Sequence, residues 1–237
     1  IRRPPRSTLS SSSAASDVYK RQIFNCVANG IPEYEAKYNF ESEEISITGI
    51  RQFKRNQNDY EIRFDASNLI ASMMFSSKFN IDNDMVLPKT YDIKIRPKFL
   101  KRDQSVIFNQ QENFIQSNGQ KSWQTSITES ESIFDPLNVQ IMIRIYINSG
   151  FERFSLNILD MEEGGFKKYH FEVKNIETCV VNNIEYECKI LERSREGTQR
   201  IVKYYLAKEL DYMFVKIIDT SPDKTNKLEL KEILSFG

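Results

Sequence analysis

Apolar and polar side chains alternate, with a period of two residues, along most of this chain. Clear runs cover 34–40, 60–66, 91–95 and 184–190, and turn-forming residues such as 82–84 separate them. Alternation of this kind is typical of β-strands that have one buried and one solvated face, and Asn, Asp and Gly are typical of the turns between such strands. The pattern predicts a mainly β fold of about ten short strands, arranged as a single curled antiparallel sheet or an incomplete barrel.

Two segments do not fit this pattern. Residues 109–132 are polar, and we expect them to form a long loop or a weak, exposed hairpin. In 135–148 the apolar residues alternate and many are β-branched, which favours a strand. Asp135 followed by Pro136, however, is typical of the first turn of a helix, because Asp caps free backbone N–H groups and Pro has no N–H to lose. The residues alone leave both structures open for this segment.

The first 22 residues are expected to be foreign to the protein. Residues 17–22 (DVYKRQ) resemble the in-frame translation of the end of a transposon-based DNA-library adapter, so we leave 1–22 out of the fold. The fragment 23–28 has small residues at Cys26 and Ala28, which fit the end of a signal peptide, although an ordinary first strand fits it equally well. The remaining residues, 29–237, are expected to form a single β-rich domain.

Removing this tail changes the charge of the chain. The full chain has 33 basic and 33 acidic residues, of which the tail holds five and one, so the remainder has 28 and 32 and a net charge of −4. No basic arm is then left to bind nucleic acid. Because no run of about 18 apolar residues is present, the sequence predicts no membrane-spanning helix.

The sequence offers few groups for catalysis or metal binding. His170 is the only histidine, and alternation places it on the opposite face from the aromatic rings of Tyr169 and Phe171. A zinc site needs several clustered His and Cys ligands. The sequence also has no G-x-S-x-G motif for a nucleophilic serine and no Gly-rich phosphate loop. We therefore expect no catalytic residues, no metal and no cofactor.

Cys179 and Cys188 lie on either side of a predicted hairpin, ETCVVNNIEYEC. A two-residue turn at Asn182-Asn183 would place the two cysteines diagonally, with Cβ atoms about 7 Å apart, too far for a relaxed disulfide. A four-residue loop at 182–185 would place them directly opposite each other. In an oxidising compartment we expect a disulfide, and the alternative is two buried, small apolar side chains.

Several short motifs occur in an order that resembles one bacterial family. The stretch KYYLAKELDYMFVKI (203–217) resembles the C-terminal signature of that family, with Phe214 where a proline is usual. Earlier pieces that match in order are Tyr34 with Tyr38, Leu87-Pro88 with Tyr91, Val106 to Phe108, Asp135 to Leu137, and Glu177-Thr178 with its hairpin. Over about 30–237 the chain thus resembles the bacterial envelope domain-of-unknown-function family numbered three-one-zero-eight.

The resemblance implies a secreted protein with a signal peptide, located in the periplasm of a Gram-negative bacterium. It implies a curled sheet with one helix against its concave face, similar in outline to the lipoprotein-carrier half-barrels. It therefore favours a helix over a strand for about 136–148, which would be apolar nearly all round and so buried. The resemblance brings no biochemical activity with it.

Phe and Tyr together number 27, and a half-barrel with a removable helix would leave an apolar trough. Our first hypothesis is a non-enzymatic periplasmic protein that binds an apolar ligand, such as a lipid, or a lipoprotein partner. The residues expected to gate or plug the trough are Leu69, Ile70, Met73, Met74, Phe75, Ile141 and Ile145. The alternative is an envelope structural or assembly factor that acts through contacts with a protein partner. A hydrolase is the third hypothesis, in which His170 would serve the catalytic triad.

Overall fold

The computed structural model describes residues 30–57, 59–69, 71–97, 103–128, 131–161 and 163–237. The expected tail 1–22 and the expected signal-peptide end 23–28 lie outside the described residues. The strands are β1 (Tyr34–Glu41), β2 (Ser46–Asn56), β3 (Asp59–Ser67), β4 (Ser72–Asp82), β5 (Met85–Arg96), β6 (Gln104–Asn109), β7 (Phe114–Gly119), β8 (Trp123–Ser126), β9 (Ile133–Phe134), β10 (Arg153–Leu159), β11 (Phe166–Val181), β12 (Ile184–Ser194), β13 (Ile201–Ala207), β14 (Met213–Ser221) and β15 (Lys224–Phe236). The α-helix is α2 (Asn138–Asn148), and a short 3-10 helix, η3 (Lys208–Leu210), links β13 to β14.

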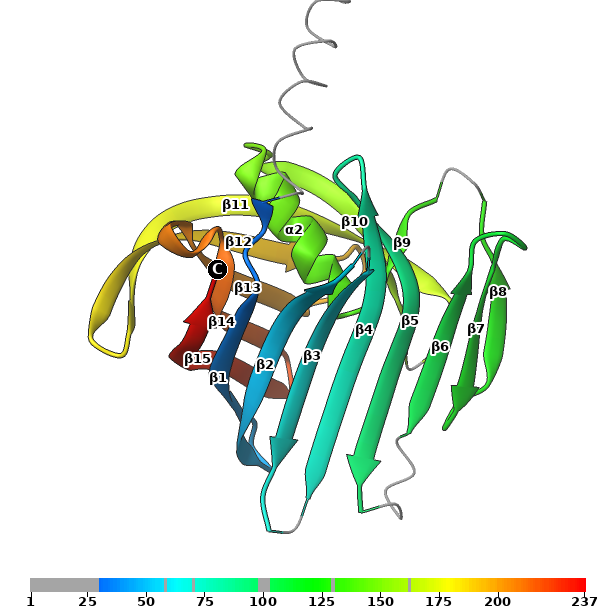
Figure 1. The fold of residues 1–237 in the computed structure, drawn as a ribbon, viewed down its shortest axis with the longest axis horizontal. Coiled ribbons are helices and arrows are strands. Elements are labelled where there is room, and N and C mark those ends of the chain that lie inside the picture. The colour runs from blue at the N-terminus through cyan, green and yellow to red at the C-terminus, as the bar shows by residue number, and fades with distance from the viewer. Residues whose placement is uncertain (1–29, 58, 70, 98–102, 129–130, 162) are drawn as a thin grey trace, which may run out of the picture.

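All fifteen strands belong to one sheet, in the order β8-β7-β6-β5-β4-β3-β2-β1-β15-β14-β13-β12-β11-β10-β9. From β1 the chain runs outward strand by strand to β8, and from β9 it returns strand by strand to β15. β15 pairs antiparallel with β1 and so joins the two runs. Because β8 and β9 are the terminal strands, the sheet is curled but not closed into a barrel (Figure 1). The mainly β, incompletely closed fold predicted by the alternation is confirmed.

Helix α2 lies on the concave side of the sheet, between the two runs of strands (Figure 1). It packs against β4 and β5, and its side chains form hydrogen bonds with both runs. Gln140 accepts a 2.6 Å hydrogen bond from Arg51 on β2, and Arg144 donates one of 3.0 Å to the carbonyl oxygen of Asp211, which follows η3. Every residue from 138 to 145 is buried. The buried helix expected for about 136–148 is confirmed, and the strand alternative is wrong.

Two rows of aromatic rings line the inner face of the sheet. The first row comes from β1 to β4, with ring centroids 5.7 to 6.4 Å apart, and comprises Tyr34, Phe53, Tyr60 and Phe79. The second comes from β10, β11, β13 and β14, with centroids 5.1 to 6.3 Å apart, and comprises Phe154, Phe171, Tyr204 and Phe214. Tyr146 of α2 packs edge-on against Phe154 at 5.0 Å. These distances are typical of stabilising aromatic pairs, so much of the aromatic content fills the core.

The cysteine hairpin, formed by β11 and β12, combines a two-residue turn with a disulfide. Asn182 and Asn183 have φ values of 50° and 64°, as a type I′ turn requires. Cys179 lies opposite Tyr186, so the two cysteines are diagonal, yet they are bonded, with Cα atoms 6.0 Å apart. The disulfide is confirmed, but the expectation that the diagonal is too long was wrong. The right-handed twist of a two-stranded ribbon shortens one of its two diagonals.

Candidate functional site

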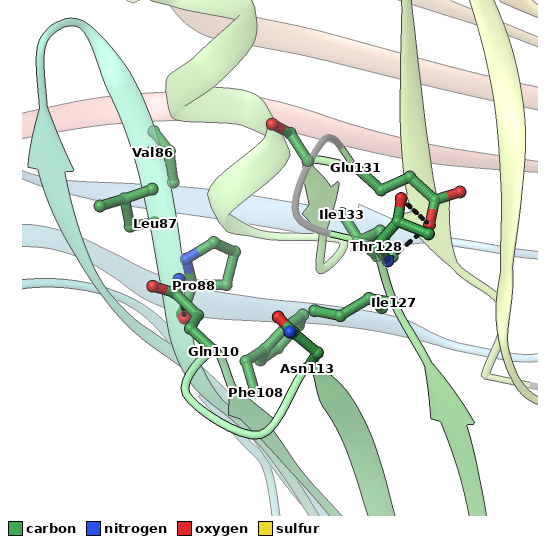
Figure 2. A pocket seen from close by; sticks show the side chains of 11 residues that line it. Val86, Leu87, Pro88, Phe108, Gln110, Asn113, Ile127, Thr128, Glu131 and Ile133 are labelled. Atoms are coloured by element: carbon green, nitrogen blue, oxygen red, sulfur yellow. Dashed lines mark hydrogen bonds between the residues drawn. The ribbon is translucent and has the colours of Figure 1, made fainter.

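The two ends of the sheet meet at a seam, where β8 and β9 are joined by residues 127–132 but do not pair. A pocket of about 280 Å³ opens at this seam (Figure 2). We call it the seam pocket, and it is lined by Val86, Leu87, Pro88, Phe108, Gln110, Asn113, Ile127, Thr128, Glu131, Ser132 and Ile133. Its lining therefore comes from the start of β5, from β6 and the turn to β7, and from the link between β8 and β9.

The floor of the seam pocket is apolar and continuous with the core. Val86, Phe108 and Ile133 each belong to the buried core, and Ile127 packs against it. Two of the polar side chains bond to each other: the carboxylate of Glu131 accepts 3.0 Å hydrogen bonds from the backbone N–H and the hydroxyl of Thr128 (Figure 2). A site with an apolar floor suits an apolar ligand.

A side-chain contact bridges the seam at the start of β8. The ring of Trp123 covers Gly164 in the turn between β10 and β11, so closely that a Cβ added at Gly164 would lie 3.0 Å from Trp123 Cγ. Gly164 has a φ of +89°, which only glycine adopts readily. The two ends of the sheet therefore touch through packing, without the backbone hydrogen bonds of paired strands.

Asp135 fixes the start of α2 directly after the seam pocket. Its Oδ1 accepts hydrogen bonds from the backbone N–H groups of Leu137 and Asn138, at 2.8 and 2.9 Å. The Asn138 side chain in turn accepts one of 3.0 Å from the N–H of Asp135, which completes a reciprocal cap. Ser77 on β4 donates a hydrogen bond of 2.6 Å to Oδ2. The cap thus ties the first turn of α2 to the inner face of the sheet.

The environment of Asp135 places its titration near neutral pH. Burial raises the pKa of its carboxyl to about 7, while the hydrogen bonds from Ser77, Asn138 and Leu137 act in the opposite direction. Tyr91 on β5 is also buried, and its pKa is raised first by burial and then by the charge of Asp135. A charge on this carboxylate is therefore costly in the apolar interior.

Two arginines lie inside the fold, Arg51 on β2 and Arg144 on α2, and each is only 2% exposed. Their guanidinium carbons lie over the rings of Tyr38 and Tyr34, at 5.7 Å from the ring centroid in both cases. Burial lowers the pKa of Arg144, and its Nη1 and Nη2 find no hydrogen-bond partner within the described chain. The interior therefore contains two guanidinium cations, those of Arg51 and Arg144. Neither forms an ion pair with a described carboxylate.

The first group of residues predicted to gate a trough lies around the start of β4. Leu69 is fully exposed in the turn between β3 and β4, and Ile70 lies outside the described residues. Met73, Met74 and Phe75 belong to β4 itself and are paired with β3 and β5, so they form no separate flap. The seam pocket is at the opposite end of β4, where Asn80 pairs with Leu87. The structure does not bring this group to the pocket, and its role in binding a ligand stays a prediction.

The second predicted group, Ile141 and Ile145, lies on α2 and is fully buried. Both side chains belong to the core between the helix and the sheet, and their role as a removable plug stays a prediction. Sequence reasoning missed the seam pocket itself. The available signal was Ile127, one of four apolar residues in the otherwise polar stretch 109–132, the others being Phe114, Ile115 and Trp123.

The candidates for other chemistry lie apart from this site. His170 is exposed, as the alternation predicted, and its Nδ1 lies 2.9 Å from the hydroxyl of Ser155 across the β10–β11 pair. Among the described residues, no three His, Cys, Asp or Glu side chains gather in a way that would hold a metal ion. Within the same residues, no helix has the length and apolar character needed to cross a membrane.

The fold and the seam pocket define a mainly β protein built on one large curled sheet, with a helix on its concave side. The chain belongs to the family described as "Protein of unknown function (DUF3108)", which matches residues 33–231. This membership confirms the resemblance carried by the short motifs. No curated protein matches the chain.

Several solved structures are similar to this one, including the three that follow. A beta-barrel-like protein of domain of unknown function DUF1849 from Brucella abortus has a TM-score of 0.55 and 9% identity, over 86% of this chain and 97% of its own. The lipoprotein LppX from Mycobacterium tuberculosis has a TM-score of 0.26 and 9% identity, over 93% and 95%. A DUF1329 family protein from Desulfovibrio piger has a TM-score of 0.29 and 11% identity, over 94% and 93%. The first of these supports the fold and nothing beyond it.

Proposed function

We propose that this protein is a non-enzymatic binding protein of the bacterial periplasm, which holds an apolar ligand or the acyl chain of a lipoprotein partner. The observation that carries this proposal is the seam pocket, whose apolar floor is continuous with the core. Its volume of about 280 Å³ is near the lower end of the range for small-molecule sites, so it suits a segment of an acyl chain. The disulfide between Cys179 and Cys188 supports an oxidising compartment.

The seam also gives a physical route to a larger site. Because β8 and β9 do not pair, they can separate without breaking backbone hydrogen bonds between strands. Separation would give up the contact of Trp123 with Gly164 and would open the inner face toward α2. In this proposal Met73, Phe75, Ile141 and Ile145 line the deeper part of the opened trough.

The test is the binding of a neutral probe, monooleoylglycerol, to the full chain by isothermal titration calorimetry. We expect saturable binding that Ile127→Gln weakens about tenfold, because a polar amide would replace apolar contact in the pocket. Ile176→Gln is the matched control, since Ile176 is 57% exposed on the β11–β12 hairpin. Absence of binding to the wild-type chain, or an equal loss in both variants, would refute the seam pocket as an acyl site.

The alternative, an envelope assembly factor, is supported by the free edge of the sheet. β8 is a terminal strand that pairs with β7, and its other edge can accept an extended segment of a protein partner. A pull-down from detergent-solubilised envelopes tests this alternative. Recovery of a partner by the wild-type chain, and its loss when Gln124→Pro removes a backbone N–H from the outer edge of β8, would favour it over the ligand-binding proposal.

A further inference from the structure

A second depression lies beside the start of α2. It has a volume of about 370 Å³ and is lined by the inner faces of β10 to β14 and by the start of α2. We call it the arginine basin. Its wall includes the apolar side chains of Ile158, Val202 and Ile217, and its floor includes Gln140. Tyr169, Arg193 and Arg195 line the same basin.

The acids of the arginine basin are already engaged with two of its four cations. Lys167 pairs with Asp160, at 2.5 Å, and with Glu163. Arg200 pairs with Asp219, with a 2.8 Å hydrogen bond from Nε to Oδ1. Arg193 and Arg195 form no ion pair with any described carboxylate. The basin therefore contains two cations that are available to an anion.

Strand register directs Arg193 into the basin. Arg193 lies opposite Phe171 on one side and Val202 on the other, and both of those side chains are buried on the inner face. Arg195 comes directly after the end of β12 and lines the same basin. The guanidinium carbons of Arg193 and Arg195 lie 4.7 and 5.7 Å from the centroid of the same ring, that of Tyr169.

Two like charges on one aromatic ring repel each other, and the contact with the ring offsets only part of this repulsion. The buried Arg51 adds a further positive charge near the basin. Gln140, on the floor of the basin, accepts its hydrogen bond from the buried Arg51. A guanidinium binds phosphate or carboxylate through two parallel hydrogen bonds, which makes an oxyanion the natural complement of this pair.

We infer that the arginine basin is an oxyanion site, in which Arg193 and Arg195 bind a phosphate or a carboxylate. The apolar wall beside them can contact the carbon part of an amphiphile, so the oxyanion can be a lipid headgroup as well as a free ion. The inference goes beyond acyl binding, because no residue of the seam pocket takes part in it.

The test compares three probes on the full chain by calorimetry at low ionic strength. The probes are inorganic phosphate, oleoyl lysophosphatidic acid, and the neutral monooleoylglycerol with the same acyl chain. The variant is the double substitution R193Q/R195Q. The matched control is R63Q/R153Q, which removes two arginines that pair with Asp65 and Glu172 and whose side chains are 44% and 81% exposed.

Two results would support the oxyanion site. If a lipid headgroup is the source, lysophosphatidic acid binds at least about tenfold more tightly than monooleoylglycerol, R193Q/R195Q abolishes this preference, and R63Q/R153Q keeps it. If a free ion is the source, inorganic phosphate binds, and the same double variant removes its binding. This second result would support the site even where monooleoylglycerol fails to bind and the proposed function fails with it.

Two other results would overturn the inference. Equal affinity of the wild-type chain for both amphiphiles, without phosphate binding, would leave the seam pocket as the ligand site and remove the oxyanion site. A preference for lysophosphatidic acid that R193Q/R195Q and R63Q/R153Q weaken equally would assign it to the general charge of the protein. Circular dichroism of both variants checks that the fold is intact.

Discussion

Asp135 caps α2 and is at the same time a buried acid, and these two roles set a specific pH dependence. In the folded protein burial raises the pKa of Asp135 to about 7, whereas an aspartate in an unfolded chain titrates at roughly 3.9. Between these two pH values the folded state binds more protons than the unfolded state. The contribution of Asp135 to the free energy of unfolding therefore falls as the pH rises from 4 to 7, and it is constant above that range.

We expect Asp135→Asn to remove this dependence, because the amide does not titrate but can still accept hydrogen bonds at the helix start. The difference in free energy of unfolding between wild type and variant should fall by about 1.4 kcal/mol for each pH unit between 4 and 7. Urea unfolding at four pH values measures it. A difference that stays constant with pH would show that the hydrogen bonds of the cap keep the carboxylate ionised.

Arg144 provides the second prediction at the scale of single residues. Its guanidinium is buried with one hydrogen bond and one aromatic contact, and Nη1 and Nη2 have no partner within the described chain. Replacing a buried, poorly paired charge by an apolar side chain of similar length is often neutral or stabilising. We expect Arg144→Met to change the free energy of unfolding by less than about 1 kcal/mol or to raise it. A loss above about 3 kcal/mol in thermal or urea unfolding would contradict this expectation.

At the scale of single elements, the cysteine hairpin allows the contribution of one disulfide to the free energy of unfolding to be measured. Cys179 and Cys188 are nine residues apart, and closing so short a loop stabilises a fold by about 2 to 3 kcal/mol in the chain-entropy account. We expect reduction of the wild-type chain to lower the free energy of unfolding by this amount. The measurement is best made in a Cys26→Ala background, so that no third thiol interferes. A C179A/C188A variant that responds to reductant in the same way would contradict the assignment.

Most strands could be predicted from the sequence, because alternating apolar and polar residues show which face of a strand is buried. The sheet buries one face of each strand against the core. The helix α2 was ambiguous for the same reason. Residues 138–145 are all buried, so their pattern does not distinguish a buried helix from a strand. Among the local features, only Asp135 and Pro136 favoured a helix over a strand. The reciprocal cap that Asp135 forms with Asn138 shows the physical reason, because it stabilises the first turn of α2.

The candidate site was much less predictable than the strands. The seam pocket brings together Leu87, Phe108 and Ile127, which come from three separate segments of the chain. Their proximity depends on the register in which β5, β6, β7 and β8 pair, and on where the link from β8 to β9 crosses the sheet. The arginine basin depends on the register of β11 with β12 in the same way. Local patterns do not contain this information.

At the scale of the whole molecule, β15 is the strand that makes one sheet from two runs. It pairs with β1 on one side and β14 on the other, so it alone joins β1–β8 to β9–β14 through strand pairing. Leu230 on β15 is 2% exposed and lies opposite Tyr38, whereas Leu234 on the same strand is 43% exposed. This pair of leucines allows the junction to be weakened with a matched control.

We expect Leu230→Ala to lower the free energy of unfolding by about 2 to 4 kcal/mol, as buried leucines typically do, and Leu234→Ala to change it by less than about 0.5 kcal/mol. Trp123, the single tryptophan, lies on β8 at the far end of the strand order and reports on unfolding there. If the sheet unfolds as one unit, Leu230→Ala shifts the tryptophan fluorescence transition and the circular dichroism transition equally. A fluorescence transition that stays in place while the dichroism transition moves would show that the two runs unfold separately, and that packing of α2 and Trp123 across the seam does not couple them.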